Sequence, residues 1–156
     1  MIIKYKKLDK QEIEDTKNLI KEYINWVDID LSFQDIEDEL KNFPLKYEKP
    51  YGAFFIAKNG DEVVGSVGLK KIESNICEMK RLYVKDKYKG YKIGETLVGI
   101  IIGEAQKCGY EKMRLDTLKK MGMAQNLYKK YGFYEISAYV YNPIEGALYM
   151  ERDLKK

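Results

Sequence analysis

Two kinds of hydrophobic spacing alternate along this 156-residue chain, and their order is the strongest constraint on its fold. Segments with apolar residues at helical spacing are separated by short apolar runs of strand length, which end at turn residues. The predicted order is one strand, two helices, three strands, a helix, a strand, a helix and two final strands. Elements in this order pack as a mixed sheet with helices on both faces, an α/β (α+β) fold, and the length fits one domain spanning residues 1–156.

Local signals set the boundaries of these elements. Asp9 followed by Glu12 is typical of a capping box at a helix start, and the Asn-Gly pair ending at Gly60 predicts a hairpin. Gly109 and Gly132 stand where helices are expected to end. Strands are predicted at 2–7, 52–57, 63–71, 76–84, 113–118, 133–141 and 147–154. Helices are predicted at 10–27, 32–42 and 121–131 and within 90–109.

The sequence contains no histidine, and this absence restricts its chemistry. Ser-His and Cys-His nucleophile pairs and histidine-ligated metal sites are excluded, and we expect no metal. General acid–base work falls to Glu, Asp, Tyr, Lys, Cys, water or a terminus. The net charge of +3 is too small to indicate nucleic-acid binding, so no nucleic-acid partner is expected.

Two cysteines, Cys77 and Cys108, are too few for a disulfide framework. Each lies in an apolar pattern, so both thiols are expected to be reduced and buried. With no signal peptide visible, this favours a reducing, cytoplasmic location. No apolar run approaches the roughly 18 residues of a membrane span, so no membrane partner is expected.

The segment 81–96 joins a strand, a basic loop and a helix whose first turn carries glycine. Unpaired N–H groups and the positive end of the helix dipole make such a start an anion site suited to phosphate. Gly90 and Gly94 let the backbone approach a phosphate closely, and nearby lysines add a positive field. The alternative is a solvated lysine face beside an ordinary helix cap. The lysines concerned are Lys85, Lys87, Lys89 and Lys92.

The run 89–94, Lys-Gly-Tyr-Lys-Ile-Gly, resembles the Q/R-x-x-G-x-G/A loop of the GNAT acetyltransferases, which wraps the pyrophosphate of acetyl-CoA. Lys89 stands where Gln or Arg is usual, which keeps the charge but loses the planar fork. Lys92 stands in place of the first glycine of the motif, and Gly94 matches the second. The departure at Lys92 bears on the local conformation of the loop.

Two further elements strengthen the resemblance. Strand 78–84, Glu-Met-Lys-Arg-Leu-Tyr-Val, is similar to the family's acidic-x-x-x-L-x-V strand. Residues 124–133 match its A-x-x-L-Y-x-x-x-G-F element, although Met121 stands where many members carry a cofactor-binding asparagine. The resemblance covers residues 52–154 and is greatest to a bacterial subgroup with E-M-K-R-L-Y-V, L-D-T-L and N-P at these places.

The resemblance implies a fold and a co-substrate. The fold is a central mixed, mostly antiparallel twisted sheet of six to seven strands with helices on both faces. The co-substrate is acetyl-CoA, whose pantetheine and thioester would meet backbone N–H groups of residues 82–84, where the strand splays from its neighbour. The residues assigned to acetyl-CoA in this way are Leu82, Tyr83, Val84, Lys89, Gly90, Tyr91, Lys92, Ile93, Gly94, Glu95, Thr96 and Tyr128.

Tyr128 is the candidate general acid, because the family places a tyrosine at this position near the sulfur of the cofactor. A tyrosine has an unperturbed pKa of about 10 and a thiol one of about 8.5, so proton transfer to the thiolate is mildly uphill unless the site favours it. Two alternatives stand beside this role. Tyr128 packs the last helix onto the sheet and nothing more, or Tyr131 supplies the proton instead.

Glu78 is the candidate general base, acting directly or through water, because some members of the family use a glutamate at the start of the equivalent strand. The alternatives are a salt bridge to Lys80 or Arg81, or a contact with the substrate ammonium without proton transfer. Asp116 is another carboxylate near a strand end. We expect it to hold a loop rather than to abstract a proton.

The implied activity is acetylation of an amine of a small molecule or a peptide, and the family also suggests a homodimer. The acceptor is expected between the first two helices and the loop 139–146. The acidic run around Glu39 would attract a cationic amine, or else form a solvated helix face. The residues expected to line this side are Gln34, Asp35, Glu39 and Tyr141.

Two other functions compete with catalysis. The first is a non-catalytic domain that binds acyl-CoA and regulates a partner, which the departures at Lys92 and Met121 favour. The second is nucleic-acid binding through the lysines and tyrosines, and the glycine spacing argues against it.

Overall fold

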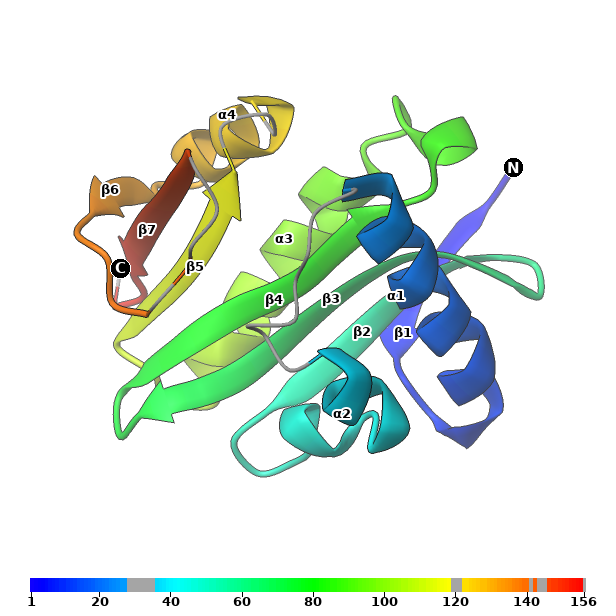
Figure 1. Ribbon diagram of the computed structural model, residues 1–156, viewed down its shortest axis with the longest axis horizontal. Helices are drawn as coiled ribbons and strands as arrows, with labels where there is room; N and C mark the ends of the chain where they lie inside the picture. Colours follow the sequence, from blue (N-terminus) through cyan, green and yellow to red (C-terminus); the bar gives the residue numbers. More distant parts are fainter. Residues whose placement is uncertain (28–35, 119–121, 141, 143–145, 156) are drawn as a thin grey trace.

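The computed structural model describes residues 1–27, 36–118, 122–140, 142 and 146–155. Its centre is a seven-stranded sheet with the strand order β1-β2-β3-β4-β5-β7-β6 (Figure 1). All neighbouring strands are antiparallel except β4 and β5, which run parallel, so the predicted mixed and mostly antiparallel sheet is confirmed. The strands are β1 (Ile3–Lys7), β2 (Ala53–Asn59), β3 (Glu62–Glu73), β4 (Ile76–Val84), β5 (Lys112–Leu118), β6 (Tyr134–Ile136) and β7 (Ala147–Asp153). The helices are α1 (Ile13–Val27), α2 (Ile36–Lys41), α3 (Ile93–Lys107) and α4 (Gly122–Lys130).

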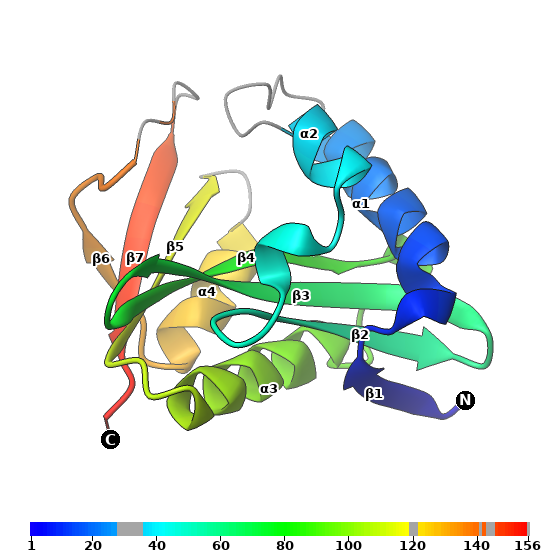
Figure 2. The ribbon, with the colours of Figure 1, turned by 90° about the horizontal axis from the view of Figure 1, so that it is seen from below.

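The helices cover both faces of the sheet, as predicted. Figure 2 shows α1 and α2 on one face and α3 on the opposite face. α3 places Ile93, Leu97 and Ile101 in the core at a spacing of four residues, and each is at most 1% exposed. Burying one such side chain stabilises the fold by about 1.5–3 kcal/mol, so this helix holds its face of the sheet strongly. A second cluster, which includes Leu19 and Ile20 of α1, fills the other face.

The predicted capping box is present where the first helical segment begins. The Asp9 side chain accepts a hydrogen bond from the backbone N–H of Gln11, and Glu12 accepts one from the backbone N–H of Asp9. The segment begins with a 3₁₀ turn, Lys10–Glu12, and α1 follows at Ile13. The second predicted helix, 32–42, is described only from Ile36, and its predicted cap Ser32 lies outside the described residues.

The predicted strand 133–141 is wrong in length, because β6 contains only Tyr134–Ile136. After Ile136 the described chain no longer pairs with β7 as a strand ladder, and side-chain hydrogen bonds hold it instead. The Tyr139 hydroxyl donates to Glu78 on β4, and the Tyr149 hydroxyl donates to the Val140 carbonyl. These long-range contacts outweigh the local strand propensity.

The two cysteines differ in burial, which corrects the expectation for Cys108. Cys77 is buried in the core under α3 and free, and burial raises the pKa of its thiol. Cys108 is also free but exposed, because it is the C-cap of α3 and lies beyond Ala105, the last buried residue of that helix. Among the described helices, none combines the length and the apolar character that crossing a membrane requires.

Candidate active site

The parallel strands β4 and β5 pair only at their first residues. The pairing joins Ile76–Glu78 to Lys112–Arg114, whereas β4 continues to Val84 and β5 to Leu118. Beyond these pairs the backbones of the two strands diverge in the middle of the sheet (Figures 1 and 2), and we call the region between their unpaired stretches the β4–β5 gap. The edge of β4 that faces this gap carries backbone groups that no strand of the described residues pairs with. Such groups need hydrogen-bond partners and are available to a molecule that enters the gap.

Residues 82–84, expected to face acetyl-CoA, lie on this unpaired stretch of β4. Leu82 and Val84 are half-buried and pack against the core under α3. Tyr83 is buried on the other face, with its ring centroid 5.1 Å from that of Tyr23 on α1. The three side chains therefore serve the two cores, and the backbone is the part of this segment that can serve a ligand.

β4 also contains a β-bulge, which the sequence analysis did not predict. Between the cross-strand pairs Ser66–Tyr83 and Gly68–Lys80, two residues of β4 oppose one residue of β3. Arg81, one of the two, has φ of +59°, in the left-handed region that residues other than glycine rarely adopt. The bulge lies where β4 has already separated from β5, so it changes the direction of backbone groups along the gap.

The loop before α3 contains two residues in the left-handed conformation. Gly90 has φ of +92°, and Lys92, the N-cap residue of α3, has φ of +61°. This conformation costs a residue other than glycine roughly 1–2 kcal/mol. Lys92 therefore adopts a conformation that glycine would adopt without this cost. Although lysine replaces the glycine of the family motif, the N-cap of α3 is still left-handed.

In the first turn of α3, backbone N–H groups are more available to a ligand than the side chains are. Lys92 provides no side-chain cap, so the first N–H groups of the helix keep their free hydrogen-bonding capacity. Ile93 is buried in the core, and the Thr96 hydroxyl donates to the Lys92 carbonyl at 2.9 Å. A Cβ at Gly94 would touch only Val84, at an ordinary 3.7 Å. The packing of the described residues does not require glycine there, which leaves space for a ligand oxygen against the backbone.

The lysines around this loop are partly neutralised by neighbouring carboxylates. The pairs are Lys85–Glu62 at 3.2 Å, Lys87–Glu62 at 3.6 Å and Lys89–Asp86 at 2.8 Å. Lys92 forms no ion pair with any residue that the structure describes. Tyr91 is exposed, and Glu95 pairs with Lys130 of α4. The positive field at the start of α3 is therefore smaller than the lysine count predicted, and Lys92 is its unpaired member among the described residues.

Tyr128 lies in α4 and is buried, with its ring centroid 5.8 Å from that of Phe133. Its hydroxyl makes no hydrogen bond within the described part of the chain. Burial raises the pKa of Tyr128, and the charge of Asp116 adds to the effect, so the phenol is protonated at neutral pH. Tyr131, the competing donor, uses its hydroxyl to bond the Glu95 carbonyl at 3.3 Å.

Glu78 is buried at the closed end of the β4–β5 gap. Its Oε2 accepts a hydrogen bond from the Tyr139 hydroxyl at 2.7 Å. The ammonium groups of Lys70 and Lys80 lie 3.7 and 3.9 Å from its Oε1. The salt bridge to Lys80 considered for Glu78 is present but long, and Arg81 pairs with another residue, Glu39. Glu78 is thus held in place by a hydroxyl donor and flanked by two cations.

Asp116 lies across the gap from this carboxylate, on β5. It accepts a hydrogen bond from Asn142 Nδ2 at 3.1 Å, which agrees with the expected role in holding a loop. Its charge contributes to the pKa shifts of Lys80, Tyr128 and Tyr139, so these groups share one electrostatic environment. The pKa of Lys80 is lowered, because burial disfavours its charge more than the nearby carboxylates favour it.

The sequence prediction did not include Tyr139 as a partner of Glu78, and it considered Lys80 only as a salt-bridge partner of that carboxylate. Strand alternation places Lys80 on the same face as Glu78, so the residue spacing held a signal for it. Tyr139 contacts Glu78 over a separation of 61 residues, and no local pattern could indicate that contact.

The expected acceptor side is only partly described. Gln34, Asp35 and Tyr141 lie outside the described residues. Glu39 is buried and ion-paired to Arg81, so it neither lines a solvated helix face nor offers a free carboxylate to an amine. The expectation for Glu39 is therefore wrong, because a cation from β4 already occupies it.

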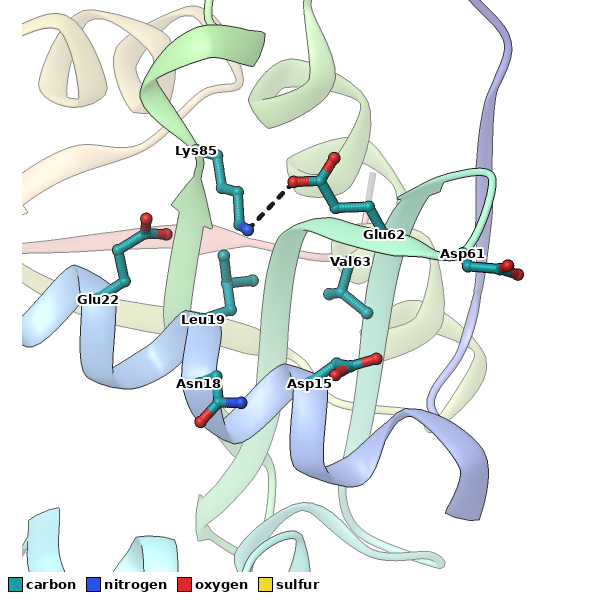
Figure 3. Close-up of a pocket in the computed structure, with 8 residues that line it drawn as sticks. All are labelled: Asp15, Asn18, Leu19, Glu22, Asp61, Glu62, Val63 and Lys85. Atoms are coloured by element: carbon teal, nitrogen blue, oxygen red, sulfur yellow. Dashed lines mark hydrogen bonds and ion pairs between the residues drawn. The ribbon is translucent and has the colours of Figure 1, made fainter.

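A pocket of about 550 Å³ lies apart from the β4–β5 gap, between α1 and the start of β3. Figure 3 shows residues of α1 facing Glu62 and Lys85, whose ion pair borders the pocket. Its lining residues are Asp15, Asn18, Leu19, Glu22, Asp61, Glu62, Val63 and Lys85. Glu78 and Tyr128 are not among them, so this pocket is distinct from the group described above.

Comparison with known proteins identifies the kind of protein that shares these features. Residues 15–133 match the model of the acetyltransferase (GNAT) family. An uncharacterised N-acetyltransferase of Schizosaccharomyces pombe is 39% identical over 150 residues, which cover 94% of this chain and 91% of the relative. An uncharacterised N-acetyltransferase of Dictyostelium discoideum is 30% identical, covering 85% of this chain and 90% of that protein.

Solved structures share the fold over nearly the whole chain. A GNAT-family acetyltransferase of Staphylococcus aureus superposes with a TM-score of 0.83 at 24% identity, covering 99% of this chain and 100% of that one. The PaiA N-acetyltransferase of Thermoplasma acidophilum, solved in complex with coenzyme A, has a TM-score of 0.77 at 22% identity. That comparison covers 98% of this chain and 99% of the other.

Proposed function

Because this chain belongs to the GNAT family of acetyltransferases, we propose that it moves an acetyl group from acetyl-CoA to an amine of a small molecule or a peptide. The transfer is a direct attack in a ternary complex, carried out by residues 1–156 as one catalytic domain. The observation that carries the proposal is the β4–β5 gap. It joins the unpaired β4 backbone to the uncapped start of α3 at one end and to Glu78 at the other.

Acetyl-CoA binds with its pyrophosphate at the first turn of α3 in this proposal. The backbone N–H groups of residues 90–94 are the donors, Gly94 leaves room for the phosphate oxygens, and Lys92 supplies an unpaired charge. The pantetheine then follows the free edge of β4 along residues 82–84. The coenzyme A complex of the Thermoplasma protein, which has the same fold, supports this donor.

The reaction requires three proton and charge movements. The amine nitrogen attacks the thioester carbon, and the bond to sulfur breaks. Glu78 accepts a proton of the amine directly or through water, and Tyr139 holds the carboxylate that does so. Backbone N–H groups of β4 stabilise the negative charge that develops on the carbonyl oxygen.

Tyr128 donates the proton that the departing thiolate needs. Its raised pKa keeps the phenol protonated and ready to donate. The same burial would also make it a weaker acid, which disfavours the transfer. Desolvation of a thiolate released beside Tyr128 would raise the pKa of the thiol as well, which offsets part of the uphill difference between the two groups.

Thiol release from acetyl-CoA, measured with and without each member of an amine panel, tests the proposal. The panel should include primary amines, amino acids and short peptides with free amino groups. Release that depends on one class of amine, with the acetylated amine identified by mass, is the expected result. Coenzyme A binding without turnover on any amine would instead favour the non-catalytic regulatory domain. The departure at Lys92 was one argument for that alternative. It is weakened because Lys92 adopts the left-handed N-cap conformation even though it is not the glycine of the motif.

A further inference from the structure

Arg81 has an unfavourable backbone conformation and is bonded to residues of two other elements, α2 and β3. Its φ of +59° is one that arginine avoids in the absence of other constraints. Among the described residues, two side chains from other elements form hydrogen bonds with it. One is Glu39 of α2, which binds the guanidinium, and the other is Ser66 of β3, which binds the backbone.

The bond to Glu39 is a buried, two-point ion pair. Arg81 Nε donates to Glu39 Oε2, and Arg81 Nη2 donates to Oε1, both at 2.7 Å. The side chains are only 6% and 3% exposed. The Tyr47 hydroxyl also donates to Oε2, at 3.0 Å. Hydrogen bonds from two directions fix the carboxylate, and the planar fork of Arg81 fixes the guanidinium against it.

The bond to Ser66 sets the direction of one peptide group. The Ser66 hydroxyl donates to the Arg81 carbonyl at 2.8 Å, so that carbonyl points toward β3. In a planar trans peptide the carbonyl and the following N–H point in opposite directions. The N–H of Leu82 belongs to the same peptide and therefore points away from β3, toward the β4–β5 gap.

We propose that Glu39, Arg81 and Ser66 are positioning residues that hold the Leu82 N–H toward the carbonyl oxygen of the bound acetyl group. The inference rests on the proposed function, which puts the thioester in the β4–β5 gap. α2 supplies the carboxylate, the bulge supplies the left-handed residue, and β3 fixes the peptide between them. A purely structural ion pair would fasten α2 to the sheet without any effect specific to the acetyl group.

A pair of double variants separates these two roles. Glu39→Gln/Arg81→Gly and Glu39→Gln/Arg81→Ala both remove the ion pair without leaving a lone buried charge. They differ mainly at the backbone of residue 81, because glycine adopts positive φ freely and alanine does not. We compare kcat with an active amine, the Kd of coenzyme A, and the ratio of the acetyl-CoA and coenzyme A affinities.

The alanine variant is expected to lose about tenfold or more in kcat, since removal of an oxyanion donor costs roughly 10²–10³ and a displaced donor costs less. Its coenzyme A Kd should stay within about threefold of the parent, and its preference for acetyl-CoA over coenzyme A should fall. The glycine variant should recover most of both losses. Equal losses in the two variants, or an unchanged kcat in the alanine variant, would overturn the inference.

Two further measurements keep the test decisive. If the double variants do not fold, Ser66→Ala removes only the bond to the Arg81 carbonyl, and it should lower kcat while coenzyme A affinity is kept. An unchanged kcat in Ser66→Ala would then refute the inference. If the parent protein turns over no amine, the proposed function fails. The acetyl-CoA to coenzyme A affinity ratio still shows whether residue 81 positions a donor.

Discussion

Tyr128 is a buried residue, and its hydroxyl makes no hydrogen bond with the rest of the described chain. Replacing it with phenylalanine removes the proton donor and keeps the ring contact with Phe133. We expect Tyr128→Phe to lower kcat by about 10²-fold, within the range for general acid catalysis, with little change in coenzyme A Kd. Steady-state kinetics and calorimetric titration measure the two quantities. Tyr131→Phe is the matched control. A lower kcat in Tyr131→Phe but not in Tyr128→Phe would identify Tyr131 as the proton donor.

The pKa of Tyr128 also makes a prediction about pH. Because the folded-state pKa is raised, the phenol stays protonated above the pH at which a free tyrosine ionises, about pH 10. The rate should therefore show no decline from loss of this proton between pH 7 and 9. A kcat that falls in that range in the wild type and not in Tyr128→Phe would show that the tyrosine ionises earlier and would contradict its buried state.

Glu78 is the second residue whose role can be tested alone. Glu78→Gln keeps an oxygen that can accept the Tyr139 hydrogen bond but cannot take up a proton at neutral pH. We expect kcat/KM at neutral pH to fall by about 10²-fold and the acidic limb of the pH–rate profile to change shape. Tyr139→Phe should have a smaller effect, since the carboxylate remains. A profile identical to that of the wild type in Glu78→Gln would assign the base to another group or to water.

At the scale of elements, the start of α3 can be separated into its structural and ligand-binding parts. A Cβ at Gly94 fits the described packing, so Gly94→Ala should stabilise the free protein by about 0.5 kcal/mol through helix propensity. The same methyl group should weaken coenzyme A binding, because it occupies the space given to a phosphate oxygen. Opposite signs for stability and affinity are the expected result, measured by urea unfolding and by calorimetry.

A charged side chain at the same position extends this test. Gly94→Glu should abolish measurable coenzyme A binding through bulk and like charge. Gly103→Glu adds the same charge to the same helix at a position with no neighbour within 4 Å, and it should leave binding unchanged. Normal binding by Gly94→Glu would mean that the pyrophosphate lies elsewhere.

The elements that the sequence predicts well are those whose signals are local. The bounds of β4 agree with the prediction, and the helix expected within 90–109 is present as α3. Periodicity and turn residues were sufficient there. The bulge at Arg81 was not predictable from a local pattern, and the carboxylate that pairs with Arg81 lies 42 residues earlier in the chain. The predicted end of β6 was wrong for a similar reason, because Tyr139 forms a hydrogen bond with Glu78 on β4 and is not part of the strand.

At the scale of the whole molecule, the candidate site is an opening between two halves of one sheet. β1 to β4 form a continuous antiparallel ladder, and β5, β7 and β6 form another. The two ladders meet over three residue pairs of β4 and β5. The sequence predicted the strands of both ladders, and the family resemblance implied that residues 82–84 splay from a neighbouring strand, but neither indicated the three residue pairs over which the ladders meet. The extent of pairing between strands that are distant in the sequence leaves no local periodic pattern from which it could be predicted.

The Glu39–Arg81 pair links α2 to this sheet, so the stability of the whole fold should depend on its ionisation. Burial opposes ionisation of Glu39, but hydrogen bonds and charge from Arg81 outweigh it and lower its pKa below the ordinary 4.5. A carboxyl group with a lowered folded-state pKa stabilises the fold above its unfolded pKa. That stabilisation is lost as the pH falls through the folded pKa. The free energy of unfolding should therefore decrease as the pH is lowered below about 4.5.

Glu39→Gln isolates this contribution from that of the other carboxylates. At pH 7 the variant should lose about 3 kcal/mol of unfolding free energy, because Arg81 stays buried without an opposite charge. Urea unfolding at several pH values from 7 to 3 should then show a smaller decrease for the variant than for the wild type. Glu37→Gln removes the same charge from an exposed position on α2 and should follow the wild type. Parallel curves for Glu39→Gln and the wild type would mean that the ionised pair does not stabilise the fold.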